Sequence, residues 1–437
     1  MKSFAIYFYT TFSPVFFGIA RLAGALHPKL RTFFSVREAL FEKLEKAVST
    51  LPSSSFRLWV HAASVGEFEQ ARPIIAALKE KHSNITLLVS FLSDSGYNAR
   101  KNFSDASAVF YLPADTRANA KKLVSLLKPD VLLLMRYDFW PNHLIEAKKQ
   151  GTTLILAAAV LQKKSPYFHP LLKGFYGNLF KLFDDIYTVS SYDATAFREI
   201  FSCVKAEAAG DPRFDQVVLR SLNTTNVAHL KPLYQNRTVL VAGSVWEPDV
   251  ILLLSAWQEL EERPALVLVP HQIHPENMTR LYQELRNRSL PWSPVSALSQ
   301  TFNPEEEILI IDQTGYLAEL YSLASFAYVG GGFGVNVHNT LEPAVYGIPV
   351  LFGPRYLNSP EAEALVAAGG ATVVHDRHEL SAALNVLTND TSQREKRGKI
   401  AGTFVQEKTG ATTIISERIE RCLENQKSGH LNNSETI

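Results

Sequence analysis

A carboxylate in the setting of a general base lies in the stretch His61-Ala62-Ala63-Ser64-Val65-Gly66-Glu67. This stretch joins an apolar run to a run with helical periodicity, so Glu67 falls in the first turn of a predicted helix. A carboxylate there could take the proton of a hydroxyl group, and Gly66 would leave room for the molecule that carries it. The same pattern is a capping box, in which Ser64 and Glu67 cap the helix reciprocally. The residues alone leave both interpretations open.

A second candidate site spans residues 328–354, which read YVGGGFGVNVHNTLEPAVYGIPVLFGP. A strand at 325–329 and a helix at 339–346 are predicted around its glycines. Backbone N–H groups between a strand and a helix can hold a phosphate, and a nearby carboxylate can bind sugar hydroxyls. The alternative is a glycine-rich turn followed by a capped helix. The residues that would face a ligand are Gly330, Gly331, Gly332, Gly334, His338, Asn339 and Glu342.

A third group of candidate residues follows a predicted strand at 131–135, in the order Arg136-Tyr137-Asp138-Phe139-Trp140-Pro141-Asn142. Aromatic rings can stack on a sugar or lie against a lipid headgroup, and the neighbouring charged groups can orient either one. The alternative is structural, because Trp140 and Pro141 are also typical of the packing at the start of a helix.

Three histidines, His271, His274 and His338, could be taken for zinc ligands. No cysteine or acidic residue completes a tetrahedral set near them in sequence, so contact with a phosphate or helix capping is the preferred interpretation. No Asp-x-Asp motif follows a predicted strand, where a sugar-nucleotide pyrophosphate would need a metal. The sequence therefore predicts a site that uses neither a metal ion nor a cofactor.

Strands and helices alternate from Phe56 onward, which predicts mainly parallel sheets covered on both faces. A chain of 437 residues with 46% hydrophobic content has enough apolar material for two such domains. Ligands of open α/β sheets bind at the carboxyl ends of the strands, so a cleft between the domains is expected. The predicted strands lie at 57–61, 85–91, 108–112, 131–135, 153–159 and 186–189, and then at 238–242, 265–269, 308–311, 325–329, 349–352 and 371–374.

Charge and cysteine content exclude several classes of protein. The formal net charge of +1 gives no global field that would attract nucleic acid. Cys203 and Cys422 fit neither a disulfide framework nor a zinc knuckle, which favours a reducing compartment.

The N-terminal segment has the composition of a membrane-associated segment rather than of a soluble domain. Residues 3–20 carry no charge, and Arg21, Lys29, Arg31 and Arg37 follow them. Basic residues after an apolar segment favour a membrane-associated N-terminus with the body of the protein on the cytoplasmic side. A cleaved signal peptide and a buried helix are the alternatives.

The motifs taken together resemble the 3-deoxy-D-manno-octulosonic acid (Kdo) transferases, from about Tyr9 to Val405. The residues that carry the resemblance are HPKL at 27–30, HAASVGE at 61–67, WPN at 140–142, PRFD at 212–215, AGS at 242–244, HP at 274–275, and GGG followed by HNTLEP and FGP between 330 and 354. The resemblance implies a GT-B fold, in which two Rossmann-like domains face each other across a cleft behind an N-terminal membrane-associated helix. It also implies inverting transfer of Kdo from CMP-Kdo to a lipid A precursor during synthesis of the lipopolysaccharide core.

Some site roles follow from the resemblance by position, which puts Ser244, Gly331, Gly332, Asn339 and Glu342 in the donor site, and the others come from the residue types themselves. Glu67 matches the catalytic base. The expected acceptor-binding residues are Ser64, Gly66, Arg136, Asp138 and Trp140. The expected donor-binding residues are Ser244, His271, His274, Gly330, Gly331, Gly332, Gly334, His338, Asn339 and Glu342. The chain departs from the family in two places: Arg136 and Asp138 stand where E-x-E is usual, and His271-Gln272-Ile273-His274-Pro275 replaces an R-H-P motif.

The expected domain boundaries are a membrane-associated segment at 1–48, an acceptor-binding domain at 49–220, a linker at 221–235, a donor-binding domain at 236–405, a helix at 406–424 that packs on the first domain, and a disordered tail at 425–437. The expected location is the cytoplasmic face of the inner membrane, with the N-terminus anchored or peripheral and in contact with membrane lipids. Two other functions stay open: a GT-B-like sugar-nucleotide epimerase, and a non-catalytic membrane-tethered lipid-binding protein.

Overall fold

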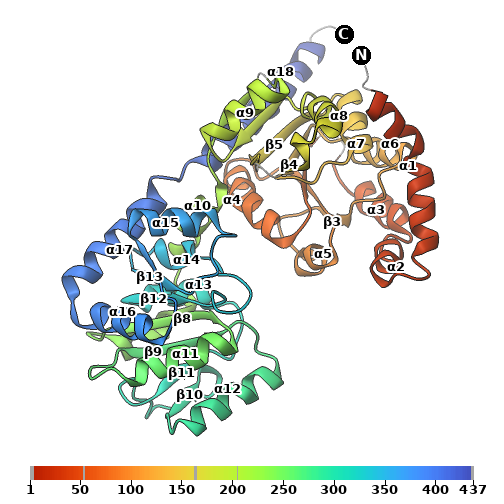
Figure 1. Ribbon diagram of the computed structural model, residues 1–437. Coiled ribbons are helices and arrows are strands. Elements are labelled where there is room, and N and C mark those ends of the chain that lie inside the picture. Colours follow the sequence, from red (N-terminus) through yellow and green to blue (C-terminus); the bar gives the residue numbers. More distant parts are fainter. Residues whose placement is uncertain (1–3, 53–54, 162–164, 204, 435–437) are drawn as a thin grey trace. The chain divides into compact units, whose positions relative to one another are not determined.

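The computed structural model describes residues 4–52, 55–161, 165–203 and 205–434, and the chain forms two compact units. Unit 1 contains Met1–Gln216 together with Thr409–Ile437, and unit 2 contains Val217–Lys408. Each unit is built on one seven-stranded sheet with helices on its faces (Figure 1). The predicted α/β class is therefore confirmed.

The sheet of unit 1 is entirely parallel, in the order β3-β2-β1-β4-β5-β6-β7. Its central strands are buried because both faces of the sheet are covered, and β4 (VLLLM) is an unbroken apolar run that is buried along its whole length. The strands are β1 (Arg57–Ala62), β2 (Thr86–Phe91), β3 (Ala108–Tyr111), β4 (Val131–Met135), β5 (Thr153–Ala159), β6 (Asp185–Thr188) and β7 (Ala206–Ala208).

Helices cover both faces of this sheet, and the last helix of the chain is one of them. Ile415, Ile419 and Leu423 of α18 pack into the core beside α4. The helical elements of unit 1 are α1 (Phe4–Ala23), α2 (Pro28–Ser35), α3 (Leu40–Ser49), α4 (Val65–Lys81), α5 (Asp94–Arg100), α6 (Arg117–Leu127), α7 (Pro141–Lys149), η1 (Pro166–Phe168), α8 (Pro170–Phe180), α9 (Ser191–Phe201) and α18 (Ala411–Ser434), and α10 (Pro212–Ser221) carries the chain into unit 2.

Unit 2 repeats the architecture with the strand order β10-β11-β9-β8-β12-β13-β14, again entirely parallel. The strands are β8 (Val239–Val245), β9 (Ala265–Pro270), β10 (Trp292–Pro294), β11 (Ile308–Ile310), β12 (Phe326–Val329), β13 (Val350–Phe352) and β14 (Ala371–Val373). The helical elements are η2 (Thr225–Tyr234), α11 (Glu247–Gln258), α12 (Pro275–Asn287), η3 (Val295–Ala297), α13 (Leu317–Leu320), η4 (Tyr321–Leu323), α14 (Leu341–Ala344), α15 (Pro360–Ala368), α16 (Arg377–Asn389) and α17 (Thr391–Gln406).

The segment predicted as a linker, 221–235, is mostly the 3₁₀ helix η2, and it belongs to the core of unit 2. Val227, Leu230 and Tyr234 are buried there because their spacing puts three apolar side chains on one side of the segment.

The C-terminal helix α18 also differs from the prediction, because it continues through residues 425–434, where the sequence predicts a disordered tail. Gln426 donates to Asp130 at 2.7 Å, so the helix is still held to unit 1 after its apolar residues end.

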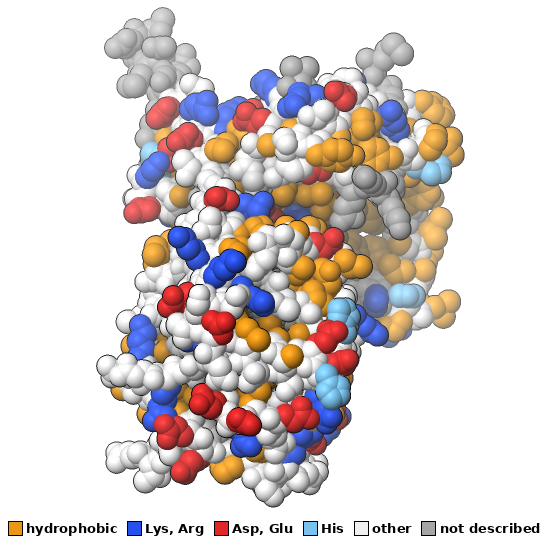
Figure 2. All heavy atoms as spheres, turned by 60° about the vertical axis from the view of Figure 1, so that its left-hand side comes forward, with side chains coloured by type: hydrophobic (Ala, Val, Ile, Leu, Met, Phe, Trp, Pro, Cys, Tyr) orange, Lys and Arg blue, Asp and Glu red, His pale blue; other side chains and the backbone are white. Residues whose placement is uncertain are grey.

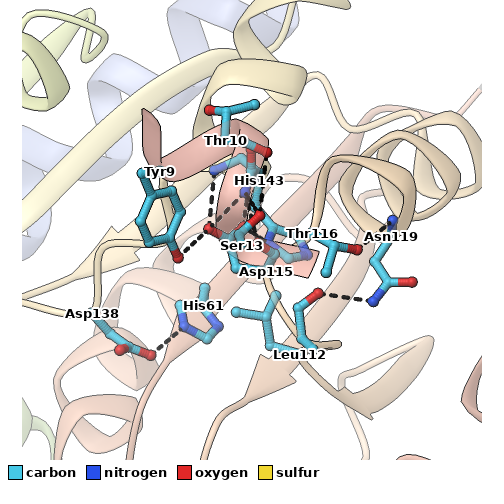
Figure 3. A network of polar contacts seen from close by, with 12 residues as sticks. Tyr9, Thr10, Ser13, His61, Leu112, Asp115, Thr116, Asn119, Asp138 and His143 are labelled. Carbon is cyan, nitrogen blue, oxygen red and sulfur yellow. Dashed lines mark hydrogen bonds and ion pairs between the residues drawn. The ribbon is translucent and has the colours of Figure 1, made fainter. Parts of the chain in front are cut away.

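Helix α1 is attached to unit 1 through its polar side chains. Asp115, which is fully buried, accepts hydrogen bonds from the Tyr9 hydroxyl at 2.9 Å and from Nδ1 of His143 at 2.5 Å (Figure 3). Ser13 accepts from Asn142 at 3.2 Å. Ile6 is buried and Phe17 lies against Trp140, but most of the large apolar side chains of α1 are exposed on the surface (Figure 2). They are Phe4, Tyr7, Phe8, Phe12, Val15, Phe16, Ile19 and Leu22.

Candidate active site

Glu67 lies in the first turn of α4, directly after β1, where Ser64 is the N-cap residue. Ser64 Oγ accepts from the Glu67 amide at 3.4 Å, and Glu67 Oε2 accepts from the Ala63 amide at 2.6 Å. The capping interpretation is thus confirmed in outline, with Ala63 in place of Ser64 as the returning donor. Burial raises the pKa of Glu67, the Ala63 amide opposes that rise, and the charge of Asp138 adds to it. A cap and a base are compatible, since Oε1 is not used in this bond.

Asp138 is connected to the core of unit 1 by a chain of hydrogen bonds. His61 Nε2 lies 2.8 Å from Asp138 Oδ2 (Figure 3), and on the other side of the ring His61 Nδ1 lies 2.8 Å from Ser90 Oγ. Ser90 also accepts from the indole N–H of Trp59 at 2.7 Å. A serine that accepts from Trp59 still has its own proton to donate to Nδ1, which leaves the imidazole proton on Nε2, facing Asp138. This series of hydrogen bonds therefore orients the Asp138 carboxylate near Glu67.

Two of the predicted acceptor-binding residues, Arg136 and Trp140, mainly contact other residues of unit 1. Arg136 donates to Gln70 at 2.8 Å and to the buried Asp211 at 3.1 Å, and its backbone has a left-handed φ of 59°. Trp140 precedes α7 and packs against the core, with its ring 6.5 Å from that of Phe17. Gly66 is exposed, as a residue on the floor of a site must be.

The sequence predicts that the glycine loop after β12 is open to a phosphate, but its amides form hydrogen bonds within the protein. The Gly330 amide donates to the carbonyl of Gly243 at 2.8 Å, and the Gly331 amide donates to Asp249 Oδ2 at 2.8 Å. The Gly334 amide donates to Gly331 at 3.0 Å. The prediction that these three amides are free for an anion is therefore wrong.

Close backbone packing explains why glycine is needed there. A Cβ at Gly330 would overlap the backbone of Ser244, and a Cβ at Gly332 would lie 2.6 Å from the Gly353 amide. Gly331 also has a φ of 94°, which favours glycine. These glycines bring strand ends together and so shape the wall of the site.

The helix predicted at 339–346 is also shorter than expected. α14 contains only Leu341–Ala344, and its N-cap residue is Thr340, which makes no side-chain cap. Asn339 Oδ1 accepts instead from the Leu341 amide at 3.1 Å, so it closes a turn rather than capping with Glu342. Pro343 and Gly347 so close together leave no room for a longer helix.

A cavity of ≈ 340 Å³ in unit 2 brings several of the predicted donor residues together. It contains Ser244, His338, Asn339 and Glu342, and sequence analysis missed its arginine, Arg220. Arg220 comes from the last turn of α10, pairs with Glu319 at 2.7 Å and lies 3.8 Å from Glu342. The feature of the sequence that could have identified Arg220 is its position at the end of α10, the helix that begins with the PRFD motif. A cation, a hydroxyl and a carboxylate in one cavity suit an anionic sugar derivative.

The remaining predicted donor residues, His271 and His274, are not among the described residues that line this cavity. His271 is instead stacked against both Trp246 and His338, with ring centroids 4.5 Å and 4.3 Å away. His274 is the exposed residue that precedes α12. Over the part of the chain that the structure describes, no three His, Cys, Asp or Glu side chains are grouped so that they could hold a metal ion.

Comparison with known sequences finds one family, through a domain model that matches part of the chain and through relatives that match most of it. Residues 35–216 match the family model described as 3-Deoxy-D-manno-octulosonic-acid transferase (kdotransferase). A 3-deoxy-D-manno-octulosonic acid transferase from Aquifex aeolicus is 28% identical over 383 residues, covering 85% of this chain and 97% of that protein. A transferase of the same name from Chlamydophila psittaci is 26% identical over 378 residues, covering 85% of this chain and 86% of its own.

Structural comparison concerns the fold alone. UDP-GlcNAc 2-epimerase from Neisseria meningitidis bound to UDP-GlcNAc superposes with a TM-score of 0.57 at 18% identity, covering 84% of this chain and 100% of that chain. This likeness confirms the predicted GT-B class of two Rossmann-like domains. The matched family domain and the relatives named above identify this chain as a homologue of the Kdo transferases, an enzyme of the glycosyltransferase class.

Proposed function

We propose that this chain is an inverting, metal-independent glycosyltransferase that moves Kdo from CMP-Kdo to a lipid A precursor. The observation that carries the proposal is the Kdo transferase domain at residues 35–216, because it contains Glu67 in the first turn of α4. The shared name of the relatives supports Kdo as the transferred sugar. The cavity in unit 2, which is lined by Arg220, Ser244 and Glu342, supports a sugar nucleotide as the donor.

In the proposed reaction, Glu67 takes the proton of a sugar hydroxyl on the acceptor. The hydroxyl oxygen forms a bond to the anomeric carbon of Kdo, and the bond from that carbon to the phosphate oxygen of CMP breaks. CMP leaves with the bonding electrons, and attack from the opposite face inverts the configuration. Burial raises the pKa of Glu67, so its carboxylate is a stronger base than that of an exposed glutamate.

Charge on the departing phosphate has to be stabilised for this step to proceed. Arg220 and Ser244, which line the cavity in unit 2, are the groups we assign to this task, and Glu342 is assigned to the ribose hydroxyls. A single phosphate leaving group held in this way needs no metal ion. Complete loss of transfer in EDTA, with recovery on adding magnesium, would contradict this part of the proposal.

The lipid acceptor and the membrane location rest on α1. Its polar side chains are bound to Asp115 and Asn142, whereas its outward face is apolar. A helix with that distribution gains free energy by lying in the headgroup region of a bilayer. Among the described residues, no helix is both long enough and apolar enough to span a membrane. Arg37 takes no part in this contact, since its guanidinium donates to the carbonyls of Leu112 and Leu92.

The proposal is tested by incubating purified protein with CMP-Kdo, with and without lipid A precursor, and determining the mass of the lipid product by mass spectrometry. CMP release should require the lipid, which would exclude an epimerase and a non-catalytic lipid-binding protein. Glu67→Gln should lower turnover by about 100-fold to 10,000-fold while CMP still binds.

Glu69→Gln is the matched control, since Glu69 lies on the same helix but pairs with Arg72 and Arg100. Its turnover should stay near that of the unchanged protein. Equal losses in both variants would point to damage of α4 and would remove Glu67 from the mechanism.

A further inference from the structure

Three aromatic rings form a stack at the carboxyl edge of the unit 2 sheet. Trp246 follows β8, His271 follows β9 and His338 follows β12, and these strands are neighbours in the order β9-β8-β12. His271 lies over the other two rings, 4.5 Å from Trp246 and 4.3 Å from His338. The rings of Trp246 and His338 are nearly parallel, with 11° between their planes, and Trp246 Nε1 lies 2.8 Å from His338 Nε2.

The bond between Trp246 and His338 determines where the imidazole proton lies. An indole N–H can only donate, so Nε2 of His338 must accept and therefore carries no proton. A neutral imidazole then has its proton on Nδ1. A charged imidazole would place a second N–H against that of Trp246, and the bond would be lost.

Neighbouring groups fix the ring in this orientation. The Cδ2 edge of His338 lies against Gly331, where an added Cβ would be 3.0 Å away. Asp249 is fully buried and accepts from the backbone amides of both Trp246 and Gly331, at 2.9 Å and 2.8 Å. No described residue forms a hydrogen bond with Nδ1, and the ring lines the cavity that also contains Ser244 and Glu342.

We infer that Trp246 is a positioning residue, which holds His338 as a neutral imidazole whose Nδ1–H is offered to the donor in the cavity. This assignment deepens the proposed function and rests on it for the identity of that donor. It means that His338 contributes one directed hydrogen bond to an oxygen of the donor and no positive charge. The positive charge of the cavity is left to Arg220.

The charged and titratable groups around His338 support a neutral ring. Burial, and to a smaller extent the charge of His271, lowers the pKa of His338 to about 4, and Asp249 opposes both effects. Arg220 and Glu342 line the same cavity from α10 and α14 and pair with each other at 3.8 Å. Because the pKa lies well below neutrality, donor binding should not change between pH 6 and 8 through titration of His338.

The protonation state can be measured without any ligand, by ¹⁵N NMR of the histidine side chains. His338 should show a protonated Nδ1 and an unprotonated Nε2 from pH 8 down to its lowered pKa. In Trp246→Phe, which keeps a flat ring but loses the donor, His338 should become a mixture of tautomers, and its pKa should rise toward the ordinary value. Trp257→Phe is the control, because that indole donates to Pro264 elsewhere in unit 2.

Binding of CMP tests which nitrogen faces the ligand. An asparagine amide can take the place of Nδ1, whereas a glutamine amide can take the place of Nε2. His338→Asn should therefore bind CMP within about threefold of the unchanged protein, and His338→Gln should bind it about tenfold more weakly.

The two measurements separate the inference from the proposed function. An Nε2-protonated or charged His338 at neutral pH, or no change in Trp246→Phe, would overturn the inference. Equal CMP affinity for both His338 variants would overturn the ligand-facing role of Nδ1. Failure of the unchanged protein to bind CMP would count against the proposed donor, while the tautomer would still be decided by NMR.

Discussion

At the scale of single residues, the sequence revealed side chains with a local signature and missed those whose partners are distant. Glu67 was recognisable because its glycine and its cap lie within four positions. Asp249 was not, because it looks like an ordinary residue in the first turn of a helix, while one of its partners, Gly331, lies 82 positions away. Arg220 was missed for the same reason, since only the folded unit brings it to Glu342.

The protonation of Glu67 predicts a pH dependence. The base must be ionised, so kcat/KM should fall as the pH falls through the pKa of Glu67, and that pKa lies above its ordinary value. Burial is the main cause, but the charge of Asp138 contributes. Asp138→Asn should therefore move the acidic limb of the pH profile of kcat/KM to lower pH. A limb that does not move would show that Asp138 does not act on the base.

Asp249 predicts a loss of stability on a minimal change. Its carboxylate accepts from the Tyr328 hydroxyl and from the amides of Gly331 and Trp246. Asp249→Asn would put an NH₂ group against one of these donors, and the free energy of unfolding should drop by about 2–4 kcal/mol. Chemical denaturation measures this. Asp390→Asn, which exchanges one good N-cap for another on α17, should change stability by less than about 0.5 kcal/mol.

At the scale of elements, apolar runs predicted most strands but neither two of the short strands nor the environment of a helix. β7 (AEA) and β10 (WSP) were missed because they are not apolar runs, whereas the equally short β11 (ILI) and β13 (VLF) are apolar and were predicted. The apolar character of α1 was plain from the sequence, but not which side of it faces the protein. That depended on Asp115, more than 100 positions from Tyr9, which binds the polar side of the helix.

The outward face of α1 gives a direct test of membrane contact. Phe8→Glu combined with Phe16→Glu changes two exposed side chains, so the fold should be kept while binding to anionic phospholipid vesicles falls by at least about tenfold. Cosedimentation with the vesicles measures this. Leu357→Glu, at an exposed apolar residue of unit 2, should leave vesicle binding unchanged. Equal binding by all three proteins would mean that α1 is not the membrane contact.

At the scale of the whole molecule, the alternation of strands and helices was sufficient to predict two parallel α/β domains. The exact division was not predictable, because residues 221–235 are polar overall and yet place three apolar side chains in the core of unit 2. The return of the chain to unit 1 follows from Asp215, whose carboxylate accepts from the amides of Gly410 and Thr412 at 2.7 Å and 2.8 Å and so fixes the start of α18.

The contribution of α18 to unit 1 is measurable. Ile419 is fully buried, so Ile419→Ala should lower the stability of unit 1 by about 2–5 kcal/mol and leave unit 2 unchanged. Calorimetry of the full chain should show one of two unfolding transitions moving to lower temperature. Ile414→Ala on the same helix is the control, because Ile414 is exposed and should change little. If both transitions moved together, the units would not unfold independently.

Because unit 2 is inserted between the two segments of unit 1, synthesis on the ribosome imposes an order on folding. Every residue of unit 2 has been translated before Ile415, Ile419 and Leu423 exist, so the nascent chain can complete its second lobe while the first still exposes the groove that α18 will fill. The lobe that begins first is thus finished last. A chaperone bound to that uncovered groove would be released only after α18 has been translated and has packed there.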